Sequence, residues 1–175
     1  MAETLLIRPA NSGDLAAIDA LLGRSYPILL KEAYPPSVLV TAIPLISRAQ
    51  PRLLATGTYF VVSEGKEIVG AGGWTRAAPG TGARQRSDVG HIRHVVTDHR
   101  RVRSGIGRSL MTHVLGDAWG AGIRRMECFS TLVAVPFYEA VGFEALGPIM
   151  LNLRPGIDFP AVHMRLRSGN ASDWA

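Results

Sequence analysis

The residues from His91 to Arg108 combine features that bind a phosphate group. An apolar, β-branched run that ends at Thr97 is followed by an arginine-rich turn, and Gly105 and Gly107 come directly before a helical pattern. Glycines let the backbone approach a ligand, and the first N–H groups of a helix lack an intrahelical partner and favour an anion. Further positive charge comes from the arginines at positions 100, 101, 103 and 108. The pattern predicts a site for a phosphorylated ligand, such as a cofactor.

Two common nucleotide-binding motifs do not fit this loop. A Walker loop requires lysine after its second glycine, where this chain has Arg108. A dinucleotide fingerprint requires a third glycine, where this chain has Leu110, and an acidic residue about 20 residues further on. A Gly-x-Gly pair before a helix can also be an ordinary turn. The loop therefore binds a different phosphate ligand, or none.

A second segment, from Pro136 to Phe143, reads PFYEAVGF. It resembles the PFYExxGF segment of the GNAT superfamily of acyl-CoA N-acyltransferases. The loop from Val102 to Gly107 is similar to that family's phosphate loop, Arg/Gln-x-x-Gly-x-Gly/Ala, except that Val102 stands at the first position. The order of strand, loop, helix, strand and tyrosine-bearing helix is also the family's. The resemblance covers about residues 5–167 and is strongest over 90–147.

The resemblance implies both a fold and a reaction. The fold is of the α/β (α+β) class, with a single mixed, strongly bent and splayed β-sheet flanked by helices. The reaction transfers an acetyl group from acetyl-CoA (coenzyme A), as cosubstrate, to a primary amine of a small-molecule acceptor by direct attack in a ternary complex. A homodimer is a further expectation. The alternative is a non-catalytic acyl-CoA-binding sensor or regulatory module of the same fold, although retention of Tyr138 beside an intact glycine loop favours the enzyme.

The resemblance assigns acetyl-CoA to two backbone segments. At the splayed end of the central strand, the Val95 N–H would point at the thioester carbonyl, and Val96 and Thr97 would line the pantetheine arm. The alternative for this segment is an ordinary buried strand. The pyrophosphate would bind to the loop formed by Val102, Arg103, Ser104, Gly105, Ile106, Gly107 and Arg108. Loss of the first-position Arg or Gln removes a side chain but no backbone donor.

Tyr138 occupies the family's tyrosine position. Its phenol, with an unperturbed pKa near 10, could donate a proton to the departing CoA thiolate. The alternative is an amphipathic tyrosine that closes the core beside Phe137 and Phe143. The flanking Pro136 and Gly142 favour the catalytic role.

The general base is assigned to His91 or to water. By strict strand alternation His91 shares a face with Arg93, Val95 and Thr97. Several GNAT branches place a glutamate at this position, and an imidazole with a pKa near 6.5 suits the same role. His94 would face the opposite side and is the weaker candidate. A histidine in a strand can also be structural, and many family members pass the proton through water.

Composition restricts the class of protein and its compartment. A chain of 175 residues that is 47% apolar is most simply one domain (1–175), with a core of about 5–167 and a flexible tail at 168–175. No apolar stretch approaches the ~20 residues that span a bilayer, so no membrane association is expected. Cys128 is the only cysteine, which excludes an intrachain disulfide and favours a cytoplasmic protein. It has no evident His or acid partner, so a nucleophilic role is not expected.

The net charge of +5 could indicate a nucleic-acid-binding protein. The arginines gather between Arg84 and Arg108 without interleaved aromatic residues, and a cofactor with several phosphates explains that placement more simply. No nucleic-acid partner is therefore expected. No His/Cys/Asp cluster has metal-ligand spacing, so no metal is expected either.

Hydrophobic periodicity predicts the elements that carry these motifs. Strands are expected at Leu5–Arg8, Thr58–Ser63, Ile68–Thr75, Val89–Thr97, Arg125–Ser130, Leu146–Leu153 and Ala161–Arg167. Helices are expected over the apolar stripe from Leu15 to Leu22, over Gly105–Gly120 and over Val135–Val141. Prolines break the region 26–56 into short pieces, with helical segments at Val38–Ile46 and Arg52–Ala55. The resemblance assigns part of the acceptor site to this region, and the identity of the acceptor amine stays open.

Overall fold

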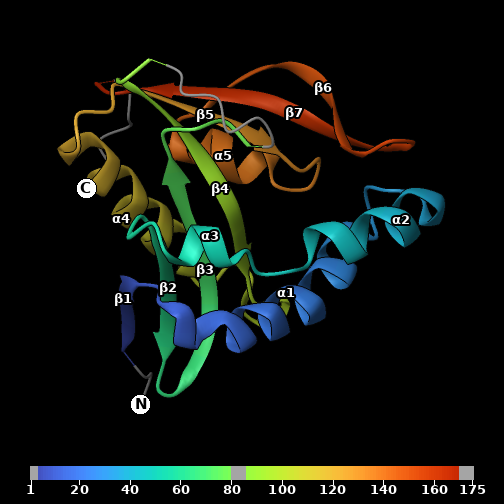
Figure 1. The fold of residues 1–175 in the computed structure, drawn as a ribbon, viewed down its shortest axis with the longest axis horizontal. Helices are drawn as coiled ribbons and strands as arrows, with labels where there is room; N and C mark the ends of the chain where they lie inside the picture. The colour runs from blue at the N-terminus through green and yellow to red at the C-terminus, as the bar shows by residue number, and fades with distance from the viewer. Residues whose placement is uncertain (1–3, 80–85, 170–175) are drawn as a thin grey trace.

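The computed structural model describes residues 4–79 and 86–169. In these residues a mixed sheet of seven strands, ordered β1-β2-β3-β4-β5-β7-β6, carries helices on both faces (Figure 1). The strands are β1 (Leu5–Pro9), β2 (Tyr59–Glu64), β3 (Glu67–Thr75), β4 (Val89–Thr97), β5 (Arg125–Ser130), β6 (Glu144–Arg154) and β7 (Ile157–Arg167). The helices are α1 (Leu15–Leu30), α2 (Pro36–Ile46), α3 (Pro51–Leu54), α4 (Ile106–Gly120) and α5 (Val135–Val141), with 3-10 turns at Ser12–Asp14 and His99–Arg101.

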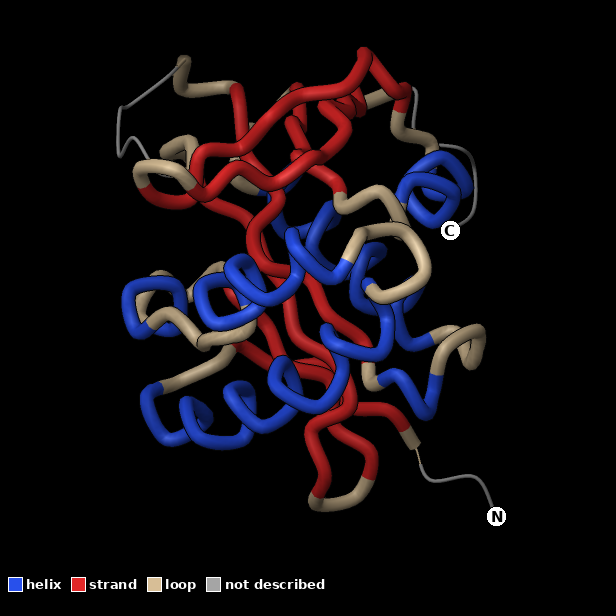
Figure 2. Tube along the Cα trace, turned by 90° about the vertical axis from the view of Figure 1, so that its right-hand side faces the viewer, coloured by secondary structure: helices blue, strands red, loops and turns tan. Residues whose placement is uncertain are grey.

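The sheet divides between β4 and β5, which pair in parallel over only a short length. Their pairing runs from Val89–Arg125 to His91–Glu127 and then stops, while β4 continues to Thr97. Beyond that point the two strands diverge. The strands β5, β6 and β7 cross the direction of β1–β4, which bends the sheet strongly (Figure 2). The predicted mixed, bent and splayed sheet is confirmed.

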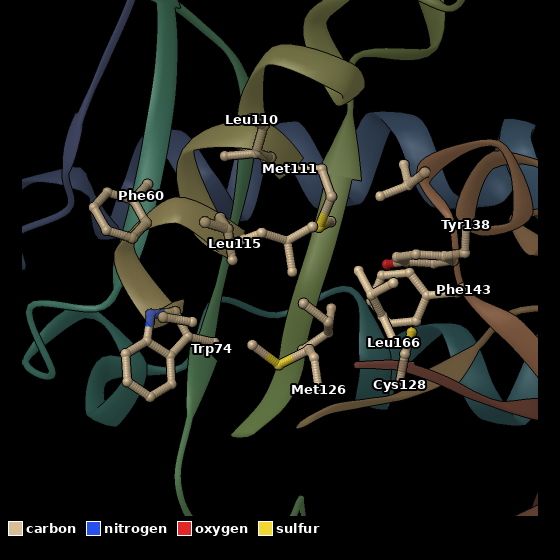
Figure 3. Close-up of a cluster of buried hydrophobic side chains, with 14 of the residues drawn as sticks. Phe60, Trp74, Leu110, Met111, Leu115, Met126, Cys128, Tyr138, Phe143 and Leu166 are labelled. Atoms are coloured by element: carbon tan, nitrogen blue, oxygen red, sulfur yellow. The ribbon is translucent and has the colours of Figure 1, made fainter. Parts of the chain in front are cut away.

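Two hydrophobic clusters hold the helices against the sheet. On one face, α4 and α5 pack over a cluster that includes Phe60, Trp74, Leu110, Met126 and Tyr138 (Figure 3). On the other face, α1, α2 and α3 pack over a second cluster, in which Ile18, Tyr59, Val96 and Phe159 are buried. The gap between the diverging strands therefore opens between two rigid layers.

Helix α1 is longer than the sequence predicts, because it continues through Pro27 to Leu30. A proline inside a helix lacks the N–H that would bond one turn back. Burial of Tyr26 and Leu30, on either side of Pro27, stabilises the last turn nonetheless. Tertiary packing thus overrides the local helix-breaking signal.

The other predicted elements are confirmed to within a few residues, except that β6 and β7 extend to 11 residues each. The flexible tail predicted at 168–175 lies mostly outside the described residues. Within residues 4–79 and 86–169, no helix is long and apolar enough to cross a bilayer.

Candidate functional site

A β-bulge interrupts β4 where the sheet divides. Ala71 of β3 pairs with Val96 of β4, and Gly73 pairs with Arg93. Between these pairs β3 has one residue, Gly72, and β4 has two, His94 and Val95. His94 has a φ of 51°, in the left-handed region that few residues other than glycine adopt. A bulge of this kind inserts one extra residue and re-aims the side chains that follow it.

The bulge changes which face each β4 side chain occupies. Ile92 and Val95 are three positions apart, yet both pack against the cluster under α4. Strict alternation would place them on opposite faces. The prediction that His91 and Arg93 share a face with Val95 and Thr97 is therefore wrong, because the extra residue shifts the alternation by one.

Two buried tyrosines bond to the carbonyl groups of the bulge. The Tyr59 hydroxyl donates to the His94 carbonyl oxygen at 2.8 Å, and the Tyr26 hydroxyl donates to the Val95 carbonyl oxygen at 3.0 Å. Burial raises the pKa of both phenols, so both stay protonated as donors. Sequence reasoning missed these residues, because their partners lie 35 and 69 positions away in the chain.

A cavity of about 560 Å³ lies beside the divergent end of β4, between the start of α4 and α5. Its lining includes most of the predicted cofactor residues, namely Val95, Val96, Thr97, Val102, Arg103, Gly105, Ile106, Gly107 and Arg108, together with Tyr138. Ser104 is the exception: it is exposed, and its hydroxyl donates to the Arg101 carbonyl oxygen within the turn. The structure thus brings two predicted segments together around one space.

The two glycines of the loop meet different requirements. Gly105 has a φ of 87° and precedes the first residue of α4. The Ser109 N–H is bonded back to the Gly105 carbonyl oxygen at 3.0 Å, which closes the first turn of α4. Gly107 must instead be small, because a Cβ there would lie 3.0 Å from the Phe137 ring. One glycine shapes the turn, and the other lets α5 pack against α4.

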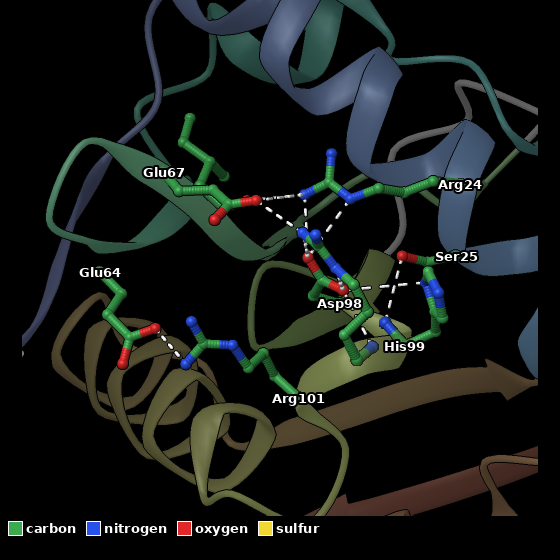
Figure 4. A network of polar contacts seen from close by, with 9 residues as sticks. Arg24, Ser25, Glu64, Glu67, Asp98, His99 and Arg101 are labelled. Atoms are coloured by element: carbon green, nitrogen blue, oxygen red, sulfur yellow. Dashed lines mark hydrogen bonds and ion pairs between the residues drawn. The ribbon is translucent and has the colours of Figure 1, made fainter. Parts of the chain in front are cut away.

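A buried carboxylate, Asp98, holds the start of the arginine-rich loop (Figure 4). Its Oδ2 accepts hydrogen bonds from Arg100 at 2.7 Å and from Arg24 of α1 at 3.0 Å. Its Oδ1 accepts from the Arg100 backbone N–H at 2.9 Å. The hydrogen bonds from Arg100, and then those from Arg24, hold the pKa of Asp98 well below its usual range. The carboxylate therefore ties the loop to α1.

The predicted arginines divide into two groups. Arg100 pairs with Glu67 as well as Asp98, and Arg101 pairs with Glu64. These pairs neutralise charge within the protein, although the Arg101 side chain also lines the cavity. Arg103 and Arg108 line the same cavity. Of the four arginines predicted to add positive charge around this turn, Arg100 does not line the cavity and pairs with Glu67 and Asp98 instead.

Tyr138 stands where the larger cavity meets a smaller one, and it lines both. Its side chain is only 5% exposed and packs edge-on against Phe137 and Phe143. Its hydroxyl is hydrogen-bonded to Cys128, and burial raises the phenol pKa well above 10. The Tyr138 side chain therefore packs in the hydrophobic core and also lines both cavities.

Cys128 is buried beside Tyr138 (Figure 3). Burial raises the pKa of its thiol to about 12, so the sulfur is a protonated thiol at neutral pH. A thiolate is the nucleophilic form of cysteine. Cys128 therefore contributes packing and a hydrogen-bond partner.

The smaller cavity, of about 170 Å³, shares Tyr26, Val95, Thr131, Ala134 and Tyr138 with the larger one. The rest of its lining comes from α2, β4, β5, β6 and β7, through Ile46, Ile92, His94, Cys128, Phe129, Ser130, Leu151, Leu153 and Phe159. Seven elements and one connecting loop thus meet around it.

His94, not His91, lies in the wall of the smaller cavity. The His94 Nε2 is 2.7 Å from the Ile46 carbonyl oxygen. Because a carbonyl oxygen only accepts, Nε2 carries the proton and Nδ1 is the bare nitrogen. That Nδ1 is enclosed by protein atoms without a hydrogen-bond partner among the described residues. Burial also lowers the pKa of His94, which keeps the ring neutral.

His91 lies near the start of β4, between Thr75 on β3 and Glu127 on β5. It is 4% exposed and lines neither cavity. Burial lowers its pKa, against the opposing charge of Glu127. Glu127 is itself bonded to His163 and Arg165. The structure does not bring His91 to the cavities, and its role as general base stays a prediction.

Residues 40–167 match the family model described as an acetyltransferase (GNAT) domain. No curated protein matches the chain. A PaiA N-acetyltransferase from Thermoplasma acidophilum, solved with coenzyme A, has a TM-score of 0.70 at 12% identity, over 94% of this chain and 99% of that one. A GCN5-related N-acetyltransferase from Rhodopseudomonas palustris has a TM-score of 0.75 at 15% identity, over 95% and 98%. A GNAT-family acetyltransferase from Brucella melitensis, solved with acetyl-CoA, has a TM-score of 0.63 at 19% identity, over 97% and 91%.

Proposed function

Because the chain belongs to the GNAT acetyltransferase family, we propose that it transfers an acetyl group from acetyl-CoA to the primary amine of a small-molecule acceptor. The observation that carries the proposal is the junction of two cavities at Val95 and Tyr138. One cavity borders the glycine loop from Val102 to Arg108, and the other is smaller and shares five lining residues with it. A two-substrate reaction by direct attack needs such a junction, because both reactants must be present at once.

The larger cavity is the proposed site of acetyl-CoA. Its pyrophosphate would lie at the start of α4, where helix N–H groups and Arg103 and Arg108 favour an anion. The pantetheine arm would follow Val96 and Thr97, and the thioester carbonyl would accept a hydrogen bond from the Val95 N–H. The divergence of β4 from β5 supports this placement, because it releases that edge of β4 from sheet pairing.

The proposed chemistry requires one bond to form and one to break. The amine nitrogen attacks the thioester carbonyl carbon and forms the C–N bond. The C–S bond then breaks, and the departing thiolate takes a proton from the Tyr138 hydroxyl. The nitrogen gives up one proton to solvent, and solvent returns one to the phenolate. The products are the N-acetylated amine and free coenzyme A.

Water is the proposed acceptor of the amine proton. His91 lines neither cavity, and the bare Nδ1 of His94 is enclosed by protein atoms. Tyr138 is suited to the other proton transfer, because burial keeps its phenol protonated at neutral pH. The two proton transfers are thus assigned to different partners.

Two measurements on the purified protein test the proposal. Acetyl-CoA should raise the melting temperature by mass action, and adding a primary amine should release free CoA thiol faster than hydrolysis alone. Binding without thiol release from a broad amine panel would instead support a non-catalytic acyl-CoA sensor. Absence of any thermal shift with acetyl-CoA would contradict the assignment of the larger cavity.

A further inference from the structure

The smaller cavity has a lining of a single chemical character. Its polar groups are His94, Ser130, Thr131 and the hydroxyls of Tyr26 and Tyr138. The rest of the wall consists of aliphatic and aromatic side chains and the Cys128 thiol. Within the described part of the chain, no Asp, Glu, Lys or Arg lines it. A ligand seated there would be in contact mainly with carbon.

The few polar groups in this wall are largely bonded to the protein itself. The Ser130 hydroxyl donates to the Thr131 carbonyl oxygen, and the Thr131 Oγ1 accepts from the Ala134 N–H. The Tyr26 hydroxyl is bonded to Val95, and His94 Nε2 to Ile46. A charged group in this cavity would lose its hydration without gaining a charged partner, which is strongly unfavourable.

The charged residues closest along the same strands do not supply that partner. Glu127 on β5 is bonded to His163 and Arg165 on β7, and it lines neither cavity. Arg93 on β4 donates to the Thr75 hydroxyl and also lies outside both linings. Neither Glu127 nor Arg93 therefore contacts a ligand in the smaller cavity.

The volume of the smaller cavity also restricts which ligands it can hold. The cavity holds about 170 Å³. Cavities of about 150 Å³ lined by Leu, Ile and Phe stay dry and bind benzene. One phenyl ring, or a branched alkyl group of similar volume, therefore fills this space, while the nitrogen stays at the junction beside Tyr138 and Val95.

We propose that the acceptor is a primary amine on a compact, uncharged apolar skeleton, either an arylalkylamine or a branched alkylamine. This substrate class rests on the function proposed above. Its amine lies at the junction of the two cavities, and its apolar skeleton fills the smaller one against Phe129, Leu151 and Phe159. Diamines are disfavoured, since their second ammonium group would enter an apolar space. α-Amino acids are disfavoured because the five residues that line both cavities include no Lys or Arg to pair with the carboxylate beside the amine.

Matched pairs of amines test the substrate class with the unmodified full chain and acetyl-CoA. We expect kcat/KM for thiol release to be at least about 100-fold higher for 2-phenylethylamine than for phenylalanine, and for 3-methylbutylamine than for 1,5-diaminopentane. The first pair differs by one carboxylate, and the second differs by one ammonium group together with the branching of the carbon chain. Equal or higher values for the charged members would overturn the class while leaving acetyl transfer in place. No thiol release from any of the four amines would overturn the proposed function, and the class with it.

A pair of variants on β6 tests whether the apolar skeleton of the acceptor lies in the smaller cavity. Leu151→Glu places a carboxylate in the wall, whereas Met150→Glu places the same group on the neighbouring, 58% exposed position of the same strand. We expect Leu151→Glu to lower kcat/KM for 2-phenylethylamine by at least about 30-fold and to narrow or reverse the preference against 1,5-diaminopentane. Met150→Glu should change both by less than about 2-fold.

The thermal shift with acetyl-CoA serves as the folding control, because neither β6 residue lines the larger cavity. If Leu151→Glu does not fold, Leu151→Trp narrows the cavity without adding charge. It should lower the 2-phenylethylamine rate far more than the ethylamine rate. A variant at Leu151 that binds acetyl-CoA and behaves like Met150→Glu with every amine would overturn the assignment of this cavity.

Discussion

The larger cavity is lined largely by two segments that follow one another in the chain, whereas the smaller cavity is lined by residues that lie far apart in it. Around the larger one, the end of β4 and the loop from Val102 to Arg108 follow one another in the chain, and α5 completes the wall. Around the smaller one, residues from α1 to β7 meet, from Tyr26 to Phe159. The lining of the larger cavity can therefore be recognised from local sequence patterns, whereas the lining of the smaller cavity depends on the tertiary structure.

The contacts that hold the walls of the two cavities in place also differ. The loop beside the larger cavity is held by charge, through Asp98 and its two arginines. The wall of the smaller cavity is held by aromatic packing, because Tyr34 stacks on Phe159 at 4.5 Å and its hydroxyl bonds to Pro160 and to the Leu132 N–H. Substitutions that change charge should therefore affect the structure of the loop, and substitutions that change side-chain shape should affect the smaller cavity.

The largest expected effect is at the glycine loop. Gly105→Glu adds a side chain at a φ of 87° and a negative charge where the pyrophosphate would lie, so acetyl-CoA affinity should fall at least about 100-fold. Gly116→Glu is the matched control, since it adds the same charge to an exposed position of α4 with open space around its Cβ. Calorimetric titration measures both. Full affinity in Gly105→Glu would remove the phosphate assignment of the loop.

The next largest effect is expected at Tyr138, one of the five residues that line both cavities. Tyr138→Phe keeps the packing of the ring against Phe137 and Phe143 and removes only the hydroxyl. If the hydroxyl protonates the thiolate, kcat should fall by roughly 10- to 1000-fold, with little change in acetyl-CoA affinity. Steady-state thiol release and titration separate the two effects. An unchanged kcat would mean that the thiolate leaves without Tyr138.

A smaller effect is expected at the charged support of the loop. Asp98→Asn keeps the shape of the side chain but leaves Arg24 and Arg100 without their buried counter-charge, so unfolding free energy should fall by about 2 kcal/mol. Because the folded pKa of Asp98 lies below its unfolded value near 3.9, its contribution is present above that pH and is lost as the pH falls through the folded pKa. Denaturant unfolding should show the difference between the two proteins at pH 7 and a smaller difference below about pH 3.

The smallest effect on turnover is expected at His91. It lies outside both cavities, so His91→Asn should change kcat by less than about 3-fold, and the acid limb of the pH–rate profile should keep its shape. Because burial lowers the pKa of His91, loss of an inflection below pH 6.5 would instead identify His91 as the base.

The same substitution should alter the pH dependence of stability. Burial lowers the folded pKa of His91, so the unfolded chain binds a proton first as the pH falls below about 6.5, and stability is lost in that window. Chemical unfolding at pH 7 and pH 5 should therefore show a smaller difference in His91→Asn than in the unaltered protein. An equal difference in both proteins would show that His91 does not titrate on unfolding.

The sequence was sufficient to predict those features that depend only on neighbouring residues. The strand at Val89–Thr97 and the helix at Val135–Val141 have the bounds that periodicity predicts, because apolar spacing within each segment determines them. The left-handed turn at Gly105 likewise needs glycine whatever surrounds it. The position of His94 could not be predicted, because one inserted residue in β4 is visible only in its pairing with β3.

By itself, the sequence determined the order of the elements, the glycine loop at the start of α4 and the tyrosine of α5, since each depends on residues close together in the chain. The tertiary structure decided that Asp98 holds the loop, that Tyr26 and Tyr59 bond to the bulge, and that His94 rather than His91 lines a cavity. It also decided the mostly apolar lining of the smaller cavity. These features arise from contacts between distant segments, and such contacts exist only once the divided sheet has brought its two halves against α1 and α2.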